Sequence, residues 1–289
     1  MVSLLGQLAV YGLIWGALYA LLGLSWNIIY TATSIFHFAH ALVFSFASYV
    51  AVLITMDLGL PLPLGVIGAI VAGVIVGWAI ERGIYRPLRR LEASPVTIFV
   101  ASLGTLIVGE AAMLIIFKPL PRKLVGFPIK AISTGSITFT TLQVATVAIS
   151  AIVILGTWLY LKKTKSGKGI QAVGSNEEMA EVLGINRDGI YLLVFAIGSG
   201  AGALGGVLYA LDGVVTPMMG MSLIFPAFIV TFVGGVGSIS GVVIAGLILG
   251  MAENLSIAWL PSDYKVIVAF AILLFVIIIR PRGLFGSTA

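Results

Sequence analysis

The sequence predicts an all-α, polytopic membrane protein built as a bundle of eight or nine transmembrane helices. Hydrophobic residues make up 60% of its 289 residues and charged residues only 9%, and the mean hydropathy is +1.16. A soluble domain needs about 25% charged residues to cover its exterior, so a soluble globular enzyme is excluded. Because one spanning helix needs about 20 apolar residues, we expect residues 1–289 to form a single transmembrane domain.

Nine apolar runs are candidate spans. The first run continues well past signal-peptide length without a basic segment before it, so we interpret it as a spanning helix. The seventh run is short and contains Pro226, Gly234, Gly235 and Gly237, so we expect a broken or re-entrant segment near 223–240, enclosed by protein. The runs cover residues 4–29, 35–56, 62–80, 95–117, 138–161, 190–211, 223–237, 241–259 and 264–279.

Basic residues predict the orientation of the bundle. Eleven of the 16 Lys and Arg residues fall in the loops 82–90 and 162–187 and at 280–282. Cytoplasmic loops of membrane proteins retain positive charge. With nine spans, this placement puts the N-terminus outside and the C-terminus in the cytoplasm.

Glycines recur at small-xxx-small spacing within the apolar runs. Helices in a bilayer associate by close backbone approach, which glycine allows, so we interpret these residues as helix-packing positions. They are Gly12 and Gly16, Gly73 and Gly77, Gly198, Gly202 and Gly206, and Gly246 and Gly250.

The longest hydrophilic stretch is the loop 162–190. Ser175 and Glu178 have the S-x-x-E spacing of a capping box, which predicts the start of a short helix, and Gly184 is expected to end it in a left-handed conformation. An apolar ridge with i, i+3, i+4 spacing lies on this helix, formed by Met179, Val182 and Leu183. The spacing alone fits a partner-docking surface and a helix lying on the protein's own membrane interface equally well.

A few polar side chains fall at membrane depth, where each is a functional hypothesis. His37 and His40 are expected on one face of the second run. They have no carboxylate or thiol beside them, so hydrogen bonding to a neighbouring helix is favoured over metal binding. For Glu110, a place on a polar pathway and a protonated packing role remain equally open, whereas Asn27 is interpreted as an interhelical hydrogen bond. The polar groups nearest span ends are assigned to interfacial water: Asp212, Glu253 and Asn254.

The sequence lacks the residue patterns of several enzyme sites. It has no cysteine, no G-x-x-x-x-G-K-[ST] phosphate loop, and neither a G-x-S-x-G nor an H-E-x-x-H motif. We therefore expect no catalytic residue, metal or cofactor in this chain, and any ATP must be hydrolysed by another chain. The basic residues lie beside the spans, so they indicate topology and not nucleic-acid binding.

Six motifs are spread over nearly the whole chain. They are Tyr19-Ala20-Leu21, Phe38-Ala39-His40, residues 81–89 (ERGIYRPLR), residues 176–186, residues 232–241 and residues 280–286. Together they resemble the LivH-like permease subunits of bacterial and archaeal branched-chain amino acid ABC importers. The family usually continues Phe-Ala-His with Gly-Glu, whereas this chain has Ala41-Leu42. The role of that acidic residue is therefore absent or moved, and the substrate could differ from Leu, Ile and Val.

The resemblance implies a transport subunit of the prokaryotic cytoplasmic (inner) membrane and not an enzyme. Its implied partners are ABC ATPase subunits holding ATP and Mg, a second permease that is a paralogue or a copy, an extracytoplasmic solute-binding protein, and membrane lipid. Because the binding protein selects the substrate, we expect an apolar cavity with a few polar groups. The resemblance also makes the short helix the ATPase-coupling helix, with Asn176, Glu177, Glu178, Met179, Ala180, Val182, Leu183 and Gly184.

Two alternatives stay open at this point. One is a permease of the same family that carries urea, amides or other amino acids. The other is an ion-coupled secondary transporter that uses Glu110 and the two histidines as a proton relay, which leaves the capped helix of the polar loop unexplained.

Overall fold

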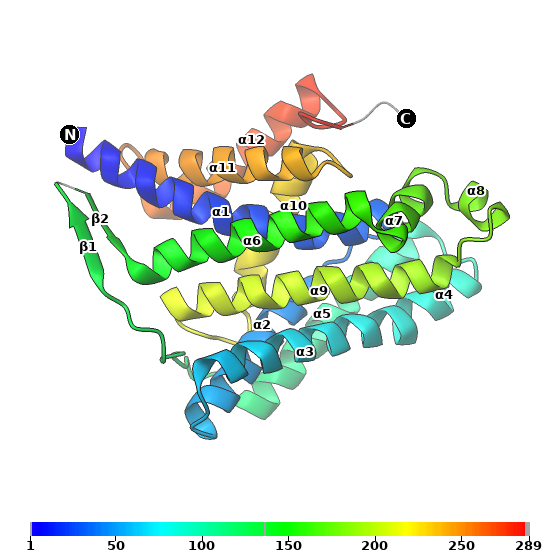
Figure 1. Ribbon diagram of the computed structural model, residues 1–289, viewed down its shortest axis with the longest axis horizontal. Coiled ribbons are helices and arrows are strands. Elements are labelled where there is room, and N and C mark those ends of the chain that lie inside the picture. Colours follow the sequence, from blue (N-terminus) through cyan, green and yellow to red (C-terminus); the bar gives the residue numbers. More distant parts are fainter. Residues whose placement is uncertain (1, 136, 287–289) are drawn as a thin grey trace.

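A computed structural model describes residues 2–135 and 137–286 as a bundle of helices, most of which run along one axis (Figure 1). Within these residues, eight helices are long and apolar enough to cross a membrane, which confirms the all-α, multi-pass prediction. They are α1 (Val2–Thr33), α2 (His40–Val52) with the π-helical turn Leu53–Asp57, α3 (Leu62–Ile80) continued by the π-helical turn Glu81–Tyr85 and α4 (Arg86–Arg90), α5 (Pro95–Phe117), α6 (Thr141–Lys163), α9 (Arg187–Asp212), α11 (Ile239–Ser256), and α12 (Lys265–Ile279) with the 3₁₀ turn Ser262–Tyr264 before it.

A ninth, shorter apolar helix, α10 (Met219–Gly234), is not among these eight. Its 16 residues rise about 24 Å at 1.5 Å each, less than the roughly 30 Å of a hydrocarbon core. α10 lies in the middle of the bundle against α1, α2, α11 and α12. Surrounding protein therefore tolerates its early end, and the predicted broken segment near 223–240 is confirmed.

The C-terminal tail completes the end of α10. Leu284 N donates to Val233 O at 2.8 Å, and Phe285 N donates to Gly234 O at 3.0 Å. These bonds satisfy carbonyls that a helix end otherwise leaves free. The chain then turns through Gly235, whose φ of +103° suits glycine.

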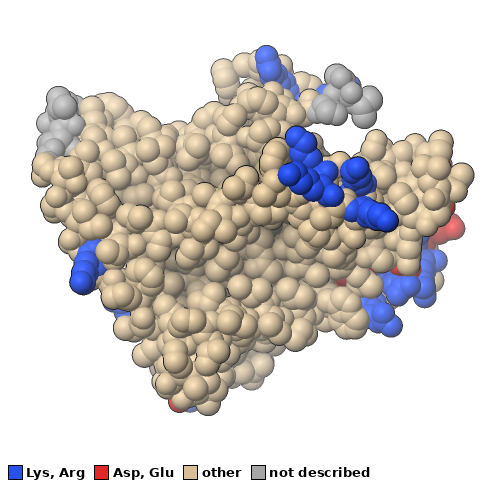
Figure 2. Space-filling model, in the orientation of Figure 1, with Lys and Arg blue, Asp and Glu red and all other residues tan. Residues whose placement is uncertain are grey.

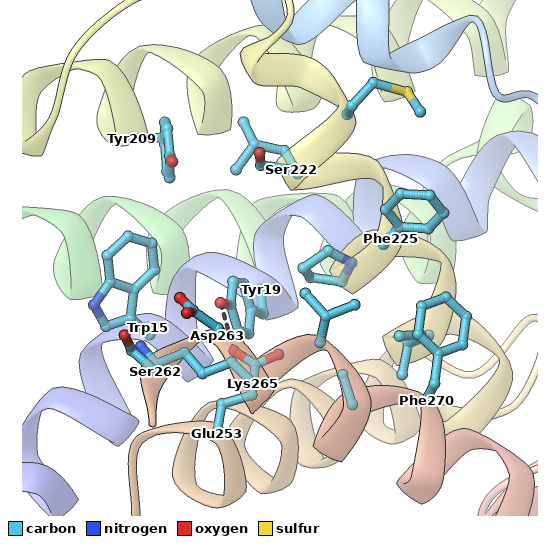
Figure 3. A pocket seen from close by; sticks show the side chains of 16 residues that line it. Trp15, Tyr19, Tyr209, Ser222, Phe225, Glu253, Ser262, Asp263, Lys265 and Phe270 are labelled. Atoms are coloured by element: carbon cyan, nitrogen blue, oxygen red, sulfur yellow. Dashed lines mark hydrogen bonds between the residues drawn. The ribbon is translucent and has the colours of Figure 1, made fainter. Parts of the chain in front are cut away.

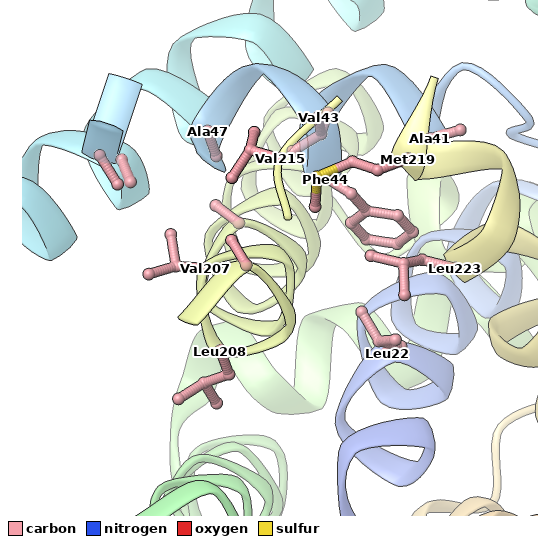
Figure 4. Close-up of a cluster of buried hydrophobic side chains, with 14 of the residues drawn as sticks. Leu22, Ala41, Val43, Phe44, Ala47, Val207, Leu208, Val215, Met219 and Leu223 are labelled. Carbon is pink, nitrogen blue, oxygen red and sulfur yellow. The ribbon is translucent and has the colours of Figure 1, made fainter. Parts of the chain in front are cut away.

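Close backbone approach joins α1 to α11. A Cβ atom added at Gly250 would lie 2.4 Å from Gly16 N, and one added at Gly246 would lie 2.7 Å from Ala20 N. These distances confirm that the glycine spacing marks packing positions. Beside this pair, side chains from four helices fill an apolar core, including Leu22, Phe44, Val207, Met219 and Leu223 (Figure 4).

The two ends of the bundle differ. The N-terminus and a hairpin of β1 (Ala131–Thr134) and β2 (Ile137–Thr140) lie at one end, called here the hairpin end (Figure 1). The other, called here the basic end, holds α4, the C-terminus and two short helices, α7 (Lys165–Ser175) and α8 (Glu177–Val182). Figure 2 shows Lys and Arg of the visible face gathered mainly toward the basic end.

One predicted helix begins later than expected. The second apolar run was expected to be helical from residue 35, but residues 34–39 form a turn and α2 begins at His40. Side chains satisfy the backbone of this turn: Trp26 Nε1 donates to His37 O at 3.2 Å, and Ala39 N donates to Ser102 Oγ at 3.0 Å. His37 therefore lies before α2, and the prediction of one shared helical face for the two histidines is wrong.

Candidate functional site

The polar loop 162–190 is mostly helical. α7 already includes Ser175 as its last residue, so the predicted Ser175 capping box is wrong. α8 starts one residue later, where Asn176 Oδ1 accepts a hydrogen bond from Met179 N at 2.8 Å. Asparagine caps a helix as well as serine does, and Ser175 is held in the preceding helix, where Asn176 N donates to Ala172 O at 3.0 Å.

The C-terminal end of α8 follows the prediction. Gly184 has a φ of +81°. Its N–H donates to Glu181 O at 2.9 Å, and Ile185 N donates to Ala180 O at 3.0 Å. This pair of bonds is the Schellman arrangement, which closes a helix with a left-handed glycine. Both ends of α8 are thus fixed by local hydrogen bonds.

α8 presents an apolar ridge to its surroundings. Met179, Val182 and Leu183 are 55%, 81% and 72% exposed, whereas Ala180 on the inner side is 2% exposed. Figure 1 places α8 at the extreme basic end, beyond the long helices. Exposed apolar side chains grouped in this way are typical of a protein contact.

Ion pairs tie α8 to the long helices. The guanidinium of Arg187, the first residue of α9, pairs with Glu177, and its Nε lies 3.2 Å from Glu181 Oε1. The next residue, Asp188, forms an ion pair with Arg86 of α4, with Asp188 Oδ2 and Arg86 Nη2 2.5 Å apart. These contacts join α8 to α9, and α9 in turn to α4.

A buried ion pair lies within the continuous helical segment formed by α3, the π-helical turn and α4. Glu81 is fully buried, and Arg89 Nη1 donates to its Oε2 at 3.1 Å. The Arg89 guanidinium also lies 4.5 Å from the ring centroid of Tyr191 in α9. The ion pair thus joins α4 to the preceding π-helical turn within the ERGIYRPLR motif, and the cation–π contact holds α4 against α9.

The two predicted histidines lie together in the core. Both are fully buried, and their ring centroids are 5.2 Å apart. His37 Nδ1 lies 2.8 Å from Tyr85 Oη, and His40 Nε2 lies 3.0 Å from Ser25 Oγ in α1. These contacts join three parts of the bundle, which is the arrangement expected of interhelical hydrogen bonding. Within the described residues, no group of three or more His, Cys, Asp or Glu side chains gathers.

Neither Asn27 nor Glu110 forms a hydrogen bond with the histidines among the described residues. Asn27 Nδ2 donates across to Gly235 O at 3.5 Å, and its Oδ1 accepts from Thr31 at 3.3 Å. Glu110 is 9% exposed on the buried stripe of α5. Its Oε1 has no hydrogen-bond partner in the described part of the chain. The sequence-predicted site residues therefore do not converge on one site.

A cavity of about 480 Å³ lies between α1, α9, α10, α11 and α12. Figure 3 shows aromatic rings and charged groups around it. Tyr19 Oη donates to Glu253 Oε2 at 2.7 Å, and Lys265 lines the same space. The 3₁₀ turn before α12 contributes Ser262 and Asp263, which places one side of the cavity at the hairpin end.

The sequence predicted an apolar cavity with a few polar groups, but it did not place the cavity or assign Glu253 to it. Glu253 was assigned to interfacial water because it lies near a span end, but it is 4% exposed and bonded to Tyr19. The sequence spacing could have shown this. Gly246, Gly250 and Glu253 stand at i, i+4 and i+7 on α11, so Glu253 shares a helix face with the two packing glycines. Such spacing places Glu253 on the side that packs against α1.

Comparison with known proteins gives a family match over most of the chain. Residues 8–277 match the family described as branched-chain amino acid transport system, permease component. The high-affinity branched-chain amino acid transport system permease protein LivH of Escherichia coli is 33% identical, over 95% of this chain and 93% of that protein. BraD of Pseudomonas aeruginosa, which carries the same description, is 31% identical over 97% of this chain and 95% of its own length.

Two further similarities are more distant. A probable branched-chain amino acid transport permease protein LivH of Methanocaldococcus jannaschii is 29% identical, over 95% of this chain and 90% of that protein. Among solved structures, PsaBC from Streptococcus pneumoniae in complex with a Fab covers 97% of this chain and 91% of its own, at 16% identity. Its TM-score of 0.48 leaves the two folds only loosely similar.

Proposed function

The chain belongs to the family of permease components of branched-chain amino acid transport systems, and from this premise we propose that α8 docks an ABC ATPase subunit. The chain is a multi-pass permease of the prokaryotic inner membrane. In the proposed assembly, ATP and Mg are bound by partner ATPase subunits, a second permease completes the membrane pathway, and an extracytoplasmic binding protein delivers a branched-chain amino acid.

The observation that carries the proposal is the exposed ridge on a doubly capped helix. The basic end faces the cytoplasm if positive charge is retained there, which is where an ATPase subunit meets the membrane domain. Met179, Val182 and Leu183 supply apolar contact area. The hydrogen bonds that cap both ends of α8 come from within this chain. Contacts of this kind bury apolar side chains at the centre of an interface.

The ion pairs around α9 supply a route for movement. ATP binding draws the ATPase subunits together, and α8 moves with them as a rigid turn. Arg187 passes this displacement to α9, and Asp188 passes it through Arg86 to α4. The bundle then alternates between outward and inward access, driven by the different affinities of ATP-bound and ATP-free subunits for the two states.

A double substitution on the ridge tests the docking surface. We expect Met179→Glu with Leu183→Glu to abolish co-purification of the ATPase subunit in detergent, because two carboxylates at the centre of an apolar contact must be desolvated. Membrane insertion and the monodisperse elution of the permease should be unchanged, since both side chains are exposed.

The matched control makes the same chemical change at the other end of the bundle. Leu120 and Ile129 are 68% and 54% exposed in the loop before the hairpin, and Leu120→Glu with Ile129→Glu should retain the ATPase. Full ATPase recovery with the ridge variant would remove the docking role of α8.

A further inference from the structure

The cavity beneath α12 holds a buried carboxylate with one free oxygen. Glu253 is 4% exposed, and only its Oε2 is used, by the hydroxyl of Tyr19. Among the described residues, nothing donates to Oε1 and no ion pair joins Glu253 to a cation. Glu253 Oε1 is therefore an unused acceptor that a cationic donor in the cavity can reach.

A lysine side chain lines the cavity on the side opposite Glu253. Lys265 begins α12 and lines the cavity opposite α11, and Asp263 lies at the exposed turn before it. Figure 3 shows the side chains of Lys265 and Glu253 extending into the same space. The cavity therefore offers an anion and a cation on separate helices.

The remaining lining is mostly apolar and aromatic. Phe225 from α10 and Phe270 from α12 face each other with ring centroids 5.8 Å apart, and Trp15 from α1 lies across the cavity from them (Figure 3). Pro226 of α10 and Ile229 one turn further on extend the Phe225 side of the cavity. A volume of about 480 Å³ exceeds what a small apolar side chain needs, and apolar walls with a few placed polar groups are typical of small-molecule sites.

We propose that this cavity binds a zwitterionic α-amino acid with an apolar side chain. Glu253 Oε1 accepts from the α-ammonium group, Lys265 Nζ donates to the α-carboxylate, and the Phe225–Phe270 pair covers the side chain. The proposal rests on the proposed transport function for its substrate class. The cavity reaches the hairpin end, the side on which a binding protein would release its cargo.

Cysteine protection tests the site on the assembled transporter. The chain contains no cysteine, so Ser222→Cys places one thiol in the cavity lining and Ser133→Cys places one on the exposed hairpin as a control. With each permease purified with its ATPase partners in nanodiscs and without binding protein, leucine should slow maleimide labelling of Ser222→Cys. Labelling of Ser133→Cys should not change.

Leucine analogues identify the groups that bind each charge. 4-Methylpentanoate lacks the ammonium group and leucinamide lacks the carboxylate, so both should protect Ser222→Cys less well than leucine. Adding Glu253→Gln should remove the preference for leucine over 4-methylpentanoate, and adding Lys265→Met should remove the preference over leucinamide. Each preference is expected at roughly ten- to hundredfold in concentration, the effect of one charge-assisted hydrogen bond.

The outcomes separate this inference from the transport proposal. Equal protection by all three compounds, or unchanged preferences in both charge variants, overturns the zwitterion site while ATPase co-purification still supports the transport role. Labelling that responds to phosphatidylethanolamine content but not to leucine makes the cavity a lipid site and also overturns the inference. Should Glu253→Gln not assemble, the analogue series on Ser222→Cys alone still decides the point.

Discussion

Two arginine–carboxylate ion pairs differ in burial, and burial decides how much free energy is lost when one partner is removed. The Glu81–Arg89 pair is almost enclosed, with side-chain exposures of 1% and 12%. The Asp57–Arg122 pair is open, with 45% and 31%, and the hydrogen bond to Asp57 raises the pKa of Arg122, which keeps it cationic. Breaking a buried pair leaves a desolvated charge, whereas water replaces the partner at an open site.

Removing one carboxylate from each pair should therefore have unequal effects. We expect Glu81→Gln to lower the free energy of unfolding by about 3–5 kcal/mol, and Asp57→Asn to lower it by less than about 1 kcal/mol. Thermal unfolding of both variants in the same detergent measures the difference. Equal shifts in the unfolding temperature would show that burial does not distinguish the pairs.

Single residues were predicted best where their conformation or exposure depends on residues nearby in the sequence. The left-handed Gly184 and the exposed Met179 and Leu183 follow from spacing within one helical turn. His37 could not be placed because its turn depends on Trp26 and Ser102, which are distant in sequence.

At the scale of elements, glycine contacts decide how closely α1 and α11 approach. Gly250→Ala should lower the free energy of unfolding by about 1–3 kcal/mol, the usual cost of overpacking, because the added Cβ would lie 2.4 Å from Gly16 N. Gly156 of α6 has no atom within 4 Å of an added Cβ, so Gly156→Ala should be neutral or slightly stabilising. Thermal unfolding by fluorescence-detected size exclusion measures both variants, and a larger loss for Gly156→Ala would contradict this packing.

The length of the apolar runs, and the polar, Gly or Pro residues that end them, predicted the long helices but not the smaller elements. The runs at 95–117 and 62–80 match α5 and α3 at both ends. α7 was missed because its sequence KSGKGIQAVGS contains three glycines, which weaken helix propensity. Its Thr164 cap and burial of Ile170 and Val173 override that preference.

At the scale of the whole molecule, the two ends of the bundle should face opposite sides of the membrane. In intact spheroplasts, an impermeant maleimide should label Ser133→Cys on the hairpin, and it should label Val182→Cys on α8 only after permeabilisation. The expectation follows from the gathering of Lys and Arg at the basic end. Labelling of Val182→Cys in intact cells would reverse the orientation and remove the cytoplasmic docking surface.

The architecture also explains why the candidate sites were harder to predict than the fold. Hydropathy along the chain reports which segments enter the membrane, whereas the cavity combines Tyr19, Glu253 and Lys265 from three helices. These three side chains come together only because α1, α11 and α12 pack around the short α10. The hydropathy pattern of the sequence does not specify this packing.

The most direct test of the docking account is crosslinking from α8 in native membranes. A tagged chain carrying Val182→Cys as its sole cysteine would be treated with a short thiol-to-amine crosslinker and its products identified by mass spectrometry. We predict one dominant adduct with an ABC ATPase subunit, lost when Met179→Glu and Leu183→Glu are added. Recovery of the ATPase with the tagged chain but no adduct through Val182, while a cysteine elsewhere at the basic end does crosslink, would contradict docking at α8.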